Sequence, residues 1–187
     1  MLEMQLFGKL SRTFVNGPGE RDIIWFQGCN LGCLGCFNPE TWNFEGGEYY
    51  SIENVLEFIK SPGLTISGGE PFLQADELYS LLRELDLPGG VVVFSGFDIG
   101  EILEDFDKKK CLDFIDLLVY GRYDRSKRIS SGLRGSSNQG YYFNGSGKIK
   151  LTDIGEQEIE INDGVITGFP IINKRLKELG ISFSRIK

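Results

Sequence analysis

Three cysteines stand within eight residues of one another, in the segment CNLGCLGC at positions 29–36. Cys29, Cys33 and Cys36 have the spacing C-x3-C-x2-C, and the chain contains one further cysteine, Cys111. Closely spaced thiols bind metal or undergo redox chemistry when they are not paired as disulfides. We therefore interpret this segment as a site of metal or redox chemistry.

The spacing leaves three kinds of site open. A structural zinc site takes four ligands, so Cys111 would have to be the fourth from far along the chain. A redox couple would use Cys33 and Cys36 and leave Cys29 without a role. A [4Fe–4S] cluster normally takes four thiolates, so three would leave one iron open to a substrate or cofactor. The spacing favours the cluster.

The elements around the cysteines alternate between strand and helix. Apolar runs predict strands at 21–28, 63–71, 89–97 and 114–121, and amphipathic runs predict helices at 51–60, 75–85 and 99–109. Such alternation is typical of an α/β fold with a parallel sheet. A closed eight-fold barrel typically needs about 250 residues. We therefore expect a partial (β/α) barrel from the 187 residues of this chain.

Four segments of suggestive chemistry each follow a predicted strand. They are the cysteine loop, SGGEP at 67–71, SGF at 95–97 and YGRY at 120–123. Ligands of parallel sheets bind at the carboxyl ends of the strands. We expect these four segments to share one face of the molecule.

The character of the chain changes after residue 121. A long polar segment leads to strands expected at 141–143, 148–152 and 156–161, and NDG then predicts a hairpin turn into VITGF. These strands predict a small antiparallel meander, followed by a final helix that Gly180 ends. We expect a core of residues 1–140 and a C-terminal extension of residues 141–187 packed on it.

Composition excludes several classes of function. The chain has no histidine, which removes a Ser-His triad, and its formal net charge of −7 argues against a nucleic-acid partner. No stretch approaches the roughly 20 apolar residues of a membrane span, and no signal peptide is evident, so we expect a cytoplasmic protein with no membrane partner. The one dense basic run, RYDRSKR at 122–128, is either a solvated loop or a contact for a phosphate or a partner.

The cysteine spacing together with SGGEP resembles the radical S-adenosylmethionine (SAM) enzymes. The resemblance implies that Cys29, Cys33 and Cys36 hold a catalytic [4Fe–4S] cluster. It also implies that the open iron binds the amino and carboxylate groups of SAM. The exposed backbone of Gly68 and Gly69 would then allow close approach of SAM, and Glu70 would help to place its amine.

A narrower resemblance is carried by GCNLGCLGCFNPETW at 28–42, by DLLVYGRYD and by LRGSSNQ at 133–139. These segments resemble the activating proteins of anaerobic ribonucleotide reductase, over roughly residues 10–140. The chain departs from that family at Tyr120, where an acidic residue is common. It departs from the superfamily at Gly35, where an aromatic residue usually precedes the last cysteine.

The resemblance also implies roles for further residues. Phe37 and Asn38, next to the last cysteine, would contact the cofactor, with Phe37 stacking on adenine or packing in the core. Ser95 and Phe97 would contact ribose or adenine, or form only a turn. Arg122 would reach the SAM carboxylate or an acid of the partner. Separately, Arg134 to Asn138 would shape the substrate opening or form an ordinary polar loop.

The expected activity is that of a radical SAM oxidoreductase of the activating type. A deoxyadenosyl radical would abstract hydrogen from a glycine of a separate glycyl radical enzyme, anaerobic ribonucleotide reductase first among the candidates, with flavodoxin or ferredoxin as electron donor. Modification of a peptide or small molecule is the alternative, but such enzymes often need auxiliary clusters, for which Cys111 alone is left. A third reading is a non-enzymatic iron–sulfur or zinc protein, against which the intact GGEP argues.

Overall fold

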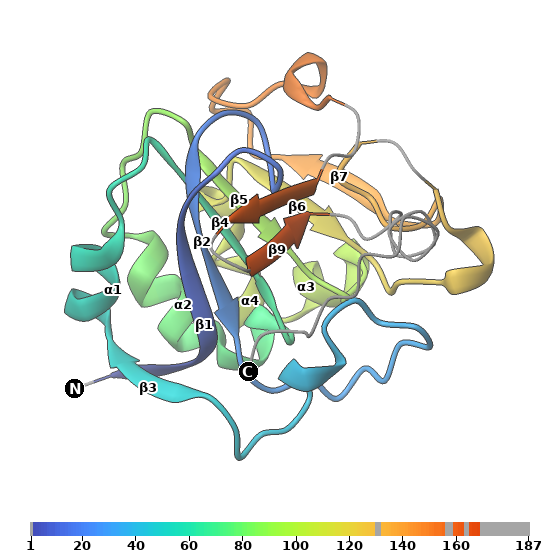
Figure 1. Ribbon diagram of the computed structural model, residues 1–187, viewed down its shortest axis with the longest axis horizontal. Helices are drawn as coiled ribbons and strands as arrows, with labels where there is room; N and C mark the ends of the chain where they lie inside the picture. Colours follow the sequence, from blue (N-terminus) through green and yellow to red (C-terminus); the bar gives the residue numbers. More distant parts are fainter. Residues whose placement is uncertain (1, 130–131, 156–158, 163–164, 169–187) are drawn as a thin grey trace.

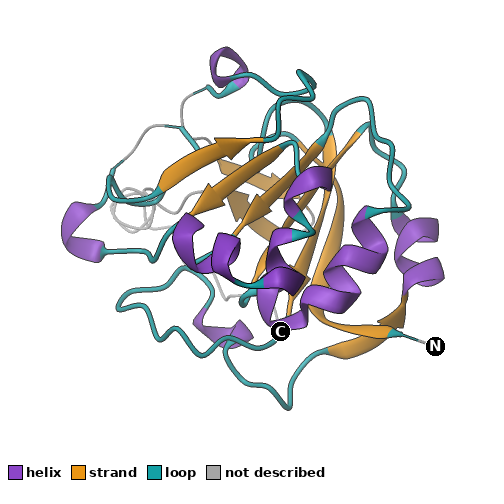
Figure 2. Cartoon of the chain, turned by 180° about the vertical axis from the view of Figure 1, so that it is seen from behind, coloured by secondary structure: helices purple, strands orange, loops and turns teal. Residues whose placement is uncertain are grey.

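The structure is a computed structural model and describes residues 2–129, 132–155, 159–162 and 165–168. Its strands are β1 Glu3–Thr13, β2 Arg21–Phe26, β3 Glu48–Ser51, β4 Gly63–Gly68, β5 Val91–Phe94, β6 Leu117–Tyr120, β7 Gly140–Phe143, β8 Ile159–Asn162 and β9 Val165–Gly168. Its α-helices are α1 Ile52–Phe58, α2 Ala75–Leu82, α3 Ile99–Glu104 and α4 Phe106–Lys109. The fold is mixed α/β, and Figure 2 shows the helices packed on one face of the sheet.

The main sheet has seven strands in the order β3-β1-β2-β4-β5-β6-β7 and is not closed. The pairs β2–β4, β4–β5 and β5–β6 are parallel, which confirms the four strands predicted from the alternating pattern. β1 pairs antiparallel with β2, and β3 pairs antiparallel with β1 at the edge of the sheet; neither strand was predicted. β7 forms the opposite edge of the sheet and pairs antiparallel with β6.

The helices follow the expected amphipathic pattern, with one correction. The Ser51 side chain accepts a hydrogen bond from the backbone N–H of Asn54 at 3.3 Å, which confirms it as the N-cap of α1. The single helix predicted over 99–109 is two helices. Asp105 separates them, because its carboxylate accepts hydrogen bonds from the backbone N–H groups of Asp107 and Lys108 and so starts a new helix.

The main core lies between the sheet and the helices. Met4 and Leu6 of β1, Ile24 and Phe26 of β2 and Leu78 of α2 are among its fully buried members. A smaller cluster on the opposite face of the sheet contains Val92, Leu117, Val119, Leu133 and Ile149. Because both faces of the central strands are covered, these strands read as continuous apolar runs in the sequence.

The predicted C-terminal meander is wrong in part. Residues 140–143 form β7 of the main sheet, and a short 3-10 helix, η5 Leu151–Asp153, occupies part of the segment expected as strand 148–152. The hairpin at NDG is confirmed, because Asn162 pairs with Val165 where β8 meets β9. Figures 1 and 2 show this hairpin on the side of the sheet opposite the helices. The predicted final helix lies outside the described residues, and the division at residue 140 stays a prediction.

Among the described residues, no helix is both long enough and apolar enough to span a membrane.

Candidate functional site

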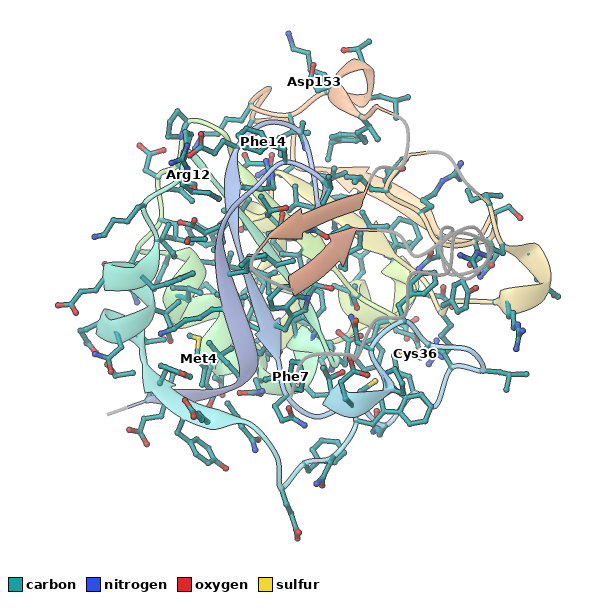
Figure 3. All side chains as sticks on the ribbon, viewed as in Figure 1. Met4, Phe7, Arg12, Phe14, Cys36 and Asp153 are labelled. Carbon is teal, nitrogen blue, oxygen red and sulfur yellow. The ribbon has the colours of Figure 1, made fainter. Side chains whose placement is uncertain are left out.

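The cysteine loop begins directly after β2 and closes on itself. The backbone N–H of Gly28 donates to the Thr41 carbonyl at 2.8 Å, and that of Cys29 donates to the Trp42 carbonyl at 3.2 Å. Gly32 and Gly35 adopt φ angles of 61° and 79°, which favour glycine. Figure 3 shows Cys36 at the opposite end of the sheet from Arg12 and Phe14. The three cysteines are therefore carried on a loop whose two ends are fixed together.

The Gly-Gly-Glu segment after β4 packs directly on the start of this loop. The backbone N–H of Gly69 donates to the Phe26 carbonyl at 2.8 Å, and that of Glu70 donates to the Gly28 carbonyl at 2.9 Å. A Cβ atom on Gly69 would lie 2.2 Å from the Gly28 carbonyl oxygen, and one on Gly68 would lie 2.4 Å from the Phe26 nitrogen. Both glycines are thus required by the contact between two backbones, whatever ligand they also meet.

Glu70 is buried and its carboxylate joins two strand ends. It accepts hydrogen bonds from the Phe72 backbone at 3.1 Å, the Ser95 hydroxyl at 2.9 Å and the Gly96 backbone at 2.7 Å. Burial raises the pKa of Glu70 to about 7, although these hydrogen bonds oppose the change. The bond from Phe72 lies within the segment after β4, and the bonds from Ser95 and Gly96 connect this segment to the end of β5. The predicted contact between Glu70 and an amine stays a prediction.

The remaining strand ends meet at the same place. A Cβ atom on Gly96 would lie 2.4 Å from Cδ1 of Leu31, so the cysteine loop packs closely on the segment after β5. The backbone N–H of Gly121, after β6, donates to the Phe97 carbonyl at 2.9 Å. Together with the contacts of Glu70, these bonds confirm that the four predicted segments share one face.

The three loop thiols are half-buried and lie close enough to influence one another. Burial raises the pKa of Cys29, and the charges of Glu70 and of the other two thiols raise it further. Burial also raises the pKa of Cys33, while a hydrogen bond from the Tyr123 backbone lowers it. The Asn38 backbone N–H donates to the sulfur of Cys36 at 3.4 Å.

Cys111 takes no part in this group. It is fully buried in the main core, and its thiol lies 3.6 Å from the Ala75 carbonyl and 3.5 Å from the Asp107 carbonyl. Burial raises the pKa of Cys111 to about 12. The hypothesis of a zinc site completed by Cys111 is therefore wrong, because this thiol lies within the layer between the helices and the sheet.

In the described part of the chain, no three His, Cys, Asp or Glu side chains surround one metal position. A zinc ion would require its ligands to converge on a single point. A [4Fe–4S] cluster requires no such convergence, since each thiolate binds a different iron. Three thiols side by side on one loop therefore fit a cluster better than they fit a single ion.

Phe37 lies in an aromatic contact beside the cysteines. Its ring centroid is 4.7 Å from that of Tyr123, and the Arg128 guanidinium lies 5.7 Å from the Phe37 centroid. A Cβ atom on Gly135 would lie 2.8 Å from the Phe37 ring. The carbonyl of Asn38 accepts two hydrogen bonds from Thr41, so this residue fixes the next turn of the loop. Stacking of Phe37 on adenine stays a prediction.

Three other predicted contacts are occupied by protein groups. Both terminal guanidinium nitrogens of Arg122 donate to the Glu101 carboxylate, at 2.7 and 2.9 Å. The Phe97 ring packs against the main core beneath the Lys108 ammonium, and the Ser95 hydroxyl is bonded to Glu70. The cofactor roles of these residues stay predictions.

Sequence reasoning missed two residues that complete the site, Leu31 and Gly96. Both lie in segments that were singled out for other reasons, and only their mutual contact reveals them. Glycine after a strand and leucine in a loop carry no chemical signal. The only indication of them in the sequence was the expectation that the segments following the strands lie close together.

Comparison with known proteins agrees with this geometry. The family described as a 4Fe–4S single cluster domain matches residues 15–142. The anaerobic ribonucleoside-triphosphate reductase-activating protein of Enterobacteria phage T4 is 28% identical over 145 residues, which are 72% of this chain and 90% of that protein. The protein of the same name from Pasteurella multocida is 32% identical over 143 residues, 68% of this chain and 90% of that protein.

A second group of relatives is matched over a smaller part of its length. The pyruvate formate-lyase-activating enzyme of Clostridium pasteurianum is 39% identical over 82 residues, which are 39% of this chain and 34% of that enzyme. The similarity to the reductase-activating proteins extends over nearly their whole length, whereas the similarity to this enzyme is confined to one part.

Proposed function

We propose that this chain generates a glycyl radical on a separate partner enzyme. The reason is that the chain belongs to the radical SAM family of glycyl radical enzyme activases. The observation that carries the proposal is the match over 90% of the length of a reductase-activating protein, with the C-x3-C-x2-C loop inside the matched cluster domain. The partner we propose is an anaerobic ribonucleotide reductase.

The cofactors of the protein are a [4Fe–4S] cluster and S-adenosylmethionine. We propose Cys29, Cys33 and Cys36 as the cluster ligands, supported by their place on one loop with closed ends. When bound, the reduced cluster would supply the electron that cleaves SAM to methionine and a 5′-deoxyadenosyl radical. The protein would orient the two cofactors and exclude water.

The residues around the thiols are proposed to hold SAM against the strand ends. Gly68, Gly69 and Glu70 lie against the loop that carries Cys29, so the methionine part of SAM would bind at this junction. Phe37 and Asn38 would lie on the other side of the thiols. Ser95 would act through Glu70, to which it is bonded, and Arg122 would have to leave Glu101 in order to contact SAM.

The open sheet is consistent with the proposal that the partner is a large protein. The seven-stranded sheet is not closed. We propose that the sheet and its helices form a partial (β/α) barrel and that the partner inserts its glycine loop at the open side to reach the cofactor. Hydrogen transfer requires near contact between the deoxyadenosyl 5′ carbon and the glycine Cα. We propose a cytoplasmic location and a flavodoxin or ferredoxin as donor, because a reducing compartment keeps the loop thiols free.

The experiment measures 5′-deoxyadenosine formed from SAM by the anaerobically reconstituted protein, with and without the reductase. A yield that rises with added reductase up to about one equivalent supports the proposal. A reductase whose radical-site glycine is replaced by alanine provides the matched control. Multiple turnovers on a small molecule or peptide, unaffected by the reductase, would replace the proposal with the alternative of substrate modification.

A further inference from the structure

The basic residues that follow Arg122 in the run 122–128 have no role in the chemistry described so far. The run carries four basic residues and one acid, Asp124, in a chain whose formal net charge is −7. Arg122 is bonded to Glu101, so the charges that project from the run are those of Arg125, Lys127 and Arg128, all exposed. We call these three residues the basic ridge.

The ridge lies against the cysteine loop. The Tyr123 backbone donates to the sulfur of Cys33, and a Cβ atom on Gly35 would lie 3.1 Å from Cδ of Arg125. Arg128 covers the Phe37 ring. In Figure 1 the gold turn η4 Arg125–Lys127 projects from the molecule beside the light-blue cysteine loop. Three exposed cations of this acidic protein therefore lie beside the cysteine loop.

The backbone beneath the ridge is held in place by the segment that follows. The Ser137 N–H donates to the Lys127 carbonyl at 2.8 Å, and the Ile129 N–H donates to the Gly135 carbonyl at 3.2 Å. The Asp124 N–H donates to the Ser136 hydroxyl at 3.1 Å. An ordinary solvated loop would not require these bonds. The ridge is displayed on a fixed support, which lowers the entropy lost when a partner binds.

The charges of the ridge are largely uncompensated. Lys127 pairs with Asp124 at 3.0 Å, but Arg125 and Arg128 form no salt bridge with any residue that the structure describes. Leu34, which precedes Gly35 at the contact with Arg125, is 80% exposed. An exposed apolar residue bordered by cations has the composition of a small protein interface.

We propose that the basic ridge and Leu34 bind the acidic face of the small electron-carrier protein that reduces this enzyme. The proposal rests on the proposed function, since the electron that the carrier delivers is the one the cluster uses to cleave SAM. In the encounter the carrier loses one electron and the [4Fe–4S] cluster gains it, with no proton or group transferred. An acidic carrier is repelled by most of this acidic chain and attracted at the ridge, so charge alone directs it to the cysteine loop.

The test compares Arg125→Glu and Lys127→Glu with Lys109→Glu, which makes the same charge change at an exposed position on α4. The first measurement is the dissociation constant of a flavodoxin for each reconstituted protein, at low and at high salt. We expect binding to weaken with salt, to weaken about tenfold in the ridge variants, and to stay unchanged in the control. Equal affinity in all four proteins would overturn the proposal.

The second measurement separates this proposal from the proposed function. SAM cleavage driven by dithionite should be equal in wild type and ridge variants, whereas cleavage driven by reduced flavodoxin should fall in the ridge variants alone. If dithionite drives no cleavage in the wild type, the proposed function fails, and flavodoxin binding still decides the docking site. Ridge variants that bind the reductase less tightly but flavodoxin normally would assign the ridge to the radical partner and overturn the proposal.

Discussion

The buried carboxylate of Glu70 accepts a hydrogen bond from the backbone N–H of Gly96 at 2.7 Å. This bond joins the segment after β4 to the segment after β5, and Leu31 of the cysteine loop also packs closely on Gly96. The acid of the Gly-Gly-Glu motif is therefore a positioning residue in the described structure. Its loss should disturb the surface on which SAM is proposed to bind.

Glu70→Gln should lower both stability and SAM affinity. An amide replaces one carboxylate oxygen with an NH2 donor, which cannot accept from the backbone N–H that it faces, Gly96 in one orientation and Phe72 in the other. Leaving one buried group without its partner costs roughly 1–3 kcal/mol. Urea unfolding of the variant measures the stability, and SAM titration of the reconstituted protein measures the affinity. Glu57→Gln, at an exposed position on α1, is the control. Loss of SAM affinity at unchanged stability would instead indicate direct contact between Glu70 and the SAM amine.

Gly69→Ala should destabilise the protein even without any cofactor. The new Cβ atom would lie 2.2 Å from a backbone oxygen, which can yield only if β2 and β4 move apart. Gly100→Ala is the matched control, because a Cβ atom there meets nothing within 4 Å and alanine favours a helix by up to about 1 kcal/mol. Thermal unfolding of the two cluster-free variants should therefore shift in opposite directions. If the Gly69→Ala variant has normal stability but fails to bind SAM, Gly69 is needed for contact with SAM and not for the packing of Gly69 on Gly28.

Each loop cysteine should be essential for the cluster, and Cys111 should not. Replacing Cys29, Cys33 or Cys36 with alanine should reduce the iron content from about four atoms per chain and abolish SAM cleavage. Cys111→Ala should keep the iron and the activity but lower the unfolding midpoint, because it opens a small cavity in the core. Iron and sulfide analysis after anaerobic reconstitution checks both. Loss of iron in Cys111→Ala would contradict this prediction and support a metal site with four cysteine ligands.

Asp22 should make stability depend on pH in acid. Burial by itself raises the pKa of Asp22, but hydrogen bonds from Ser61, Lys60 and Arg12 outweigh it and leave the pKa below its ordinary value of 3.8. A carboxyl whose pKa is lower in the folded state stabilises the protein above its unfolded pKa. That contribution is lost as the pH falls through the folded pKa. Urea unfolding of the cluster-free protein between pH 7 and pH 3 should show this loss, with a smaller slope in Asp22→Asn. An equal slope in both proteins would contradict the assignment.

The sequence identified the site more fully than the sheet that carries it. The cysteine spacing and SGGEP carry chemical information of their own, and four apolar strands alternating with helices imply their shared face. β1 was missed because only its alternate residues, such as Met4 and Leu6, are buried, while Glu3 and Phe7 are exposed. That pattern is typical of an antiparallel strand covered on one face, and Gly8 interrupts it.

The local roles of several residues were beyond sequence reasoning for a different reason. The resemblance to the radical SAM enzymes predicts that Glu70, Phe97 and Arg122 contact the cofactor. In the described structure each has a protein partner: Gly96 for Glu70, the main core for Phe97 and Glu101 for Arg122. Such partners come from other strand ends, and sequence alone cannot tell which of several nearby groups a polar side chain will meet.

The central claim is that this protein places a radical on a glycine of an anaerobic ribonucleotide reductase. The most direct measurement is the electron paramagnetic resonance spectrum of the reduced, reconstituted protein mixed with SAM and the reductase without oxygen. We predict a doublet from the α-hydrogen of a glycyl radical on the reductase, which collapses when the reductase is made with α-deuterated glycine. The cysteine variants should give no such signal. Full SAM cleavage with the reductase present and no glycyl signal on it would contradict the account.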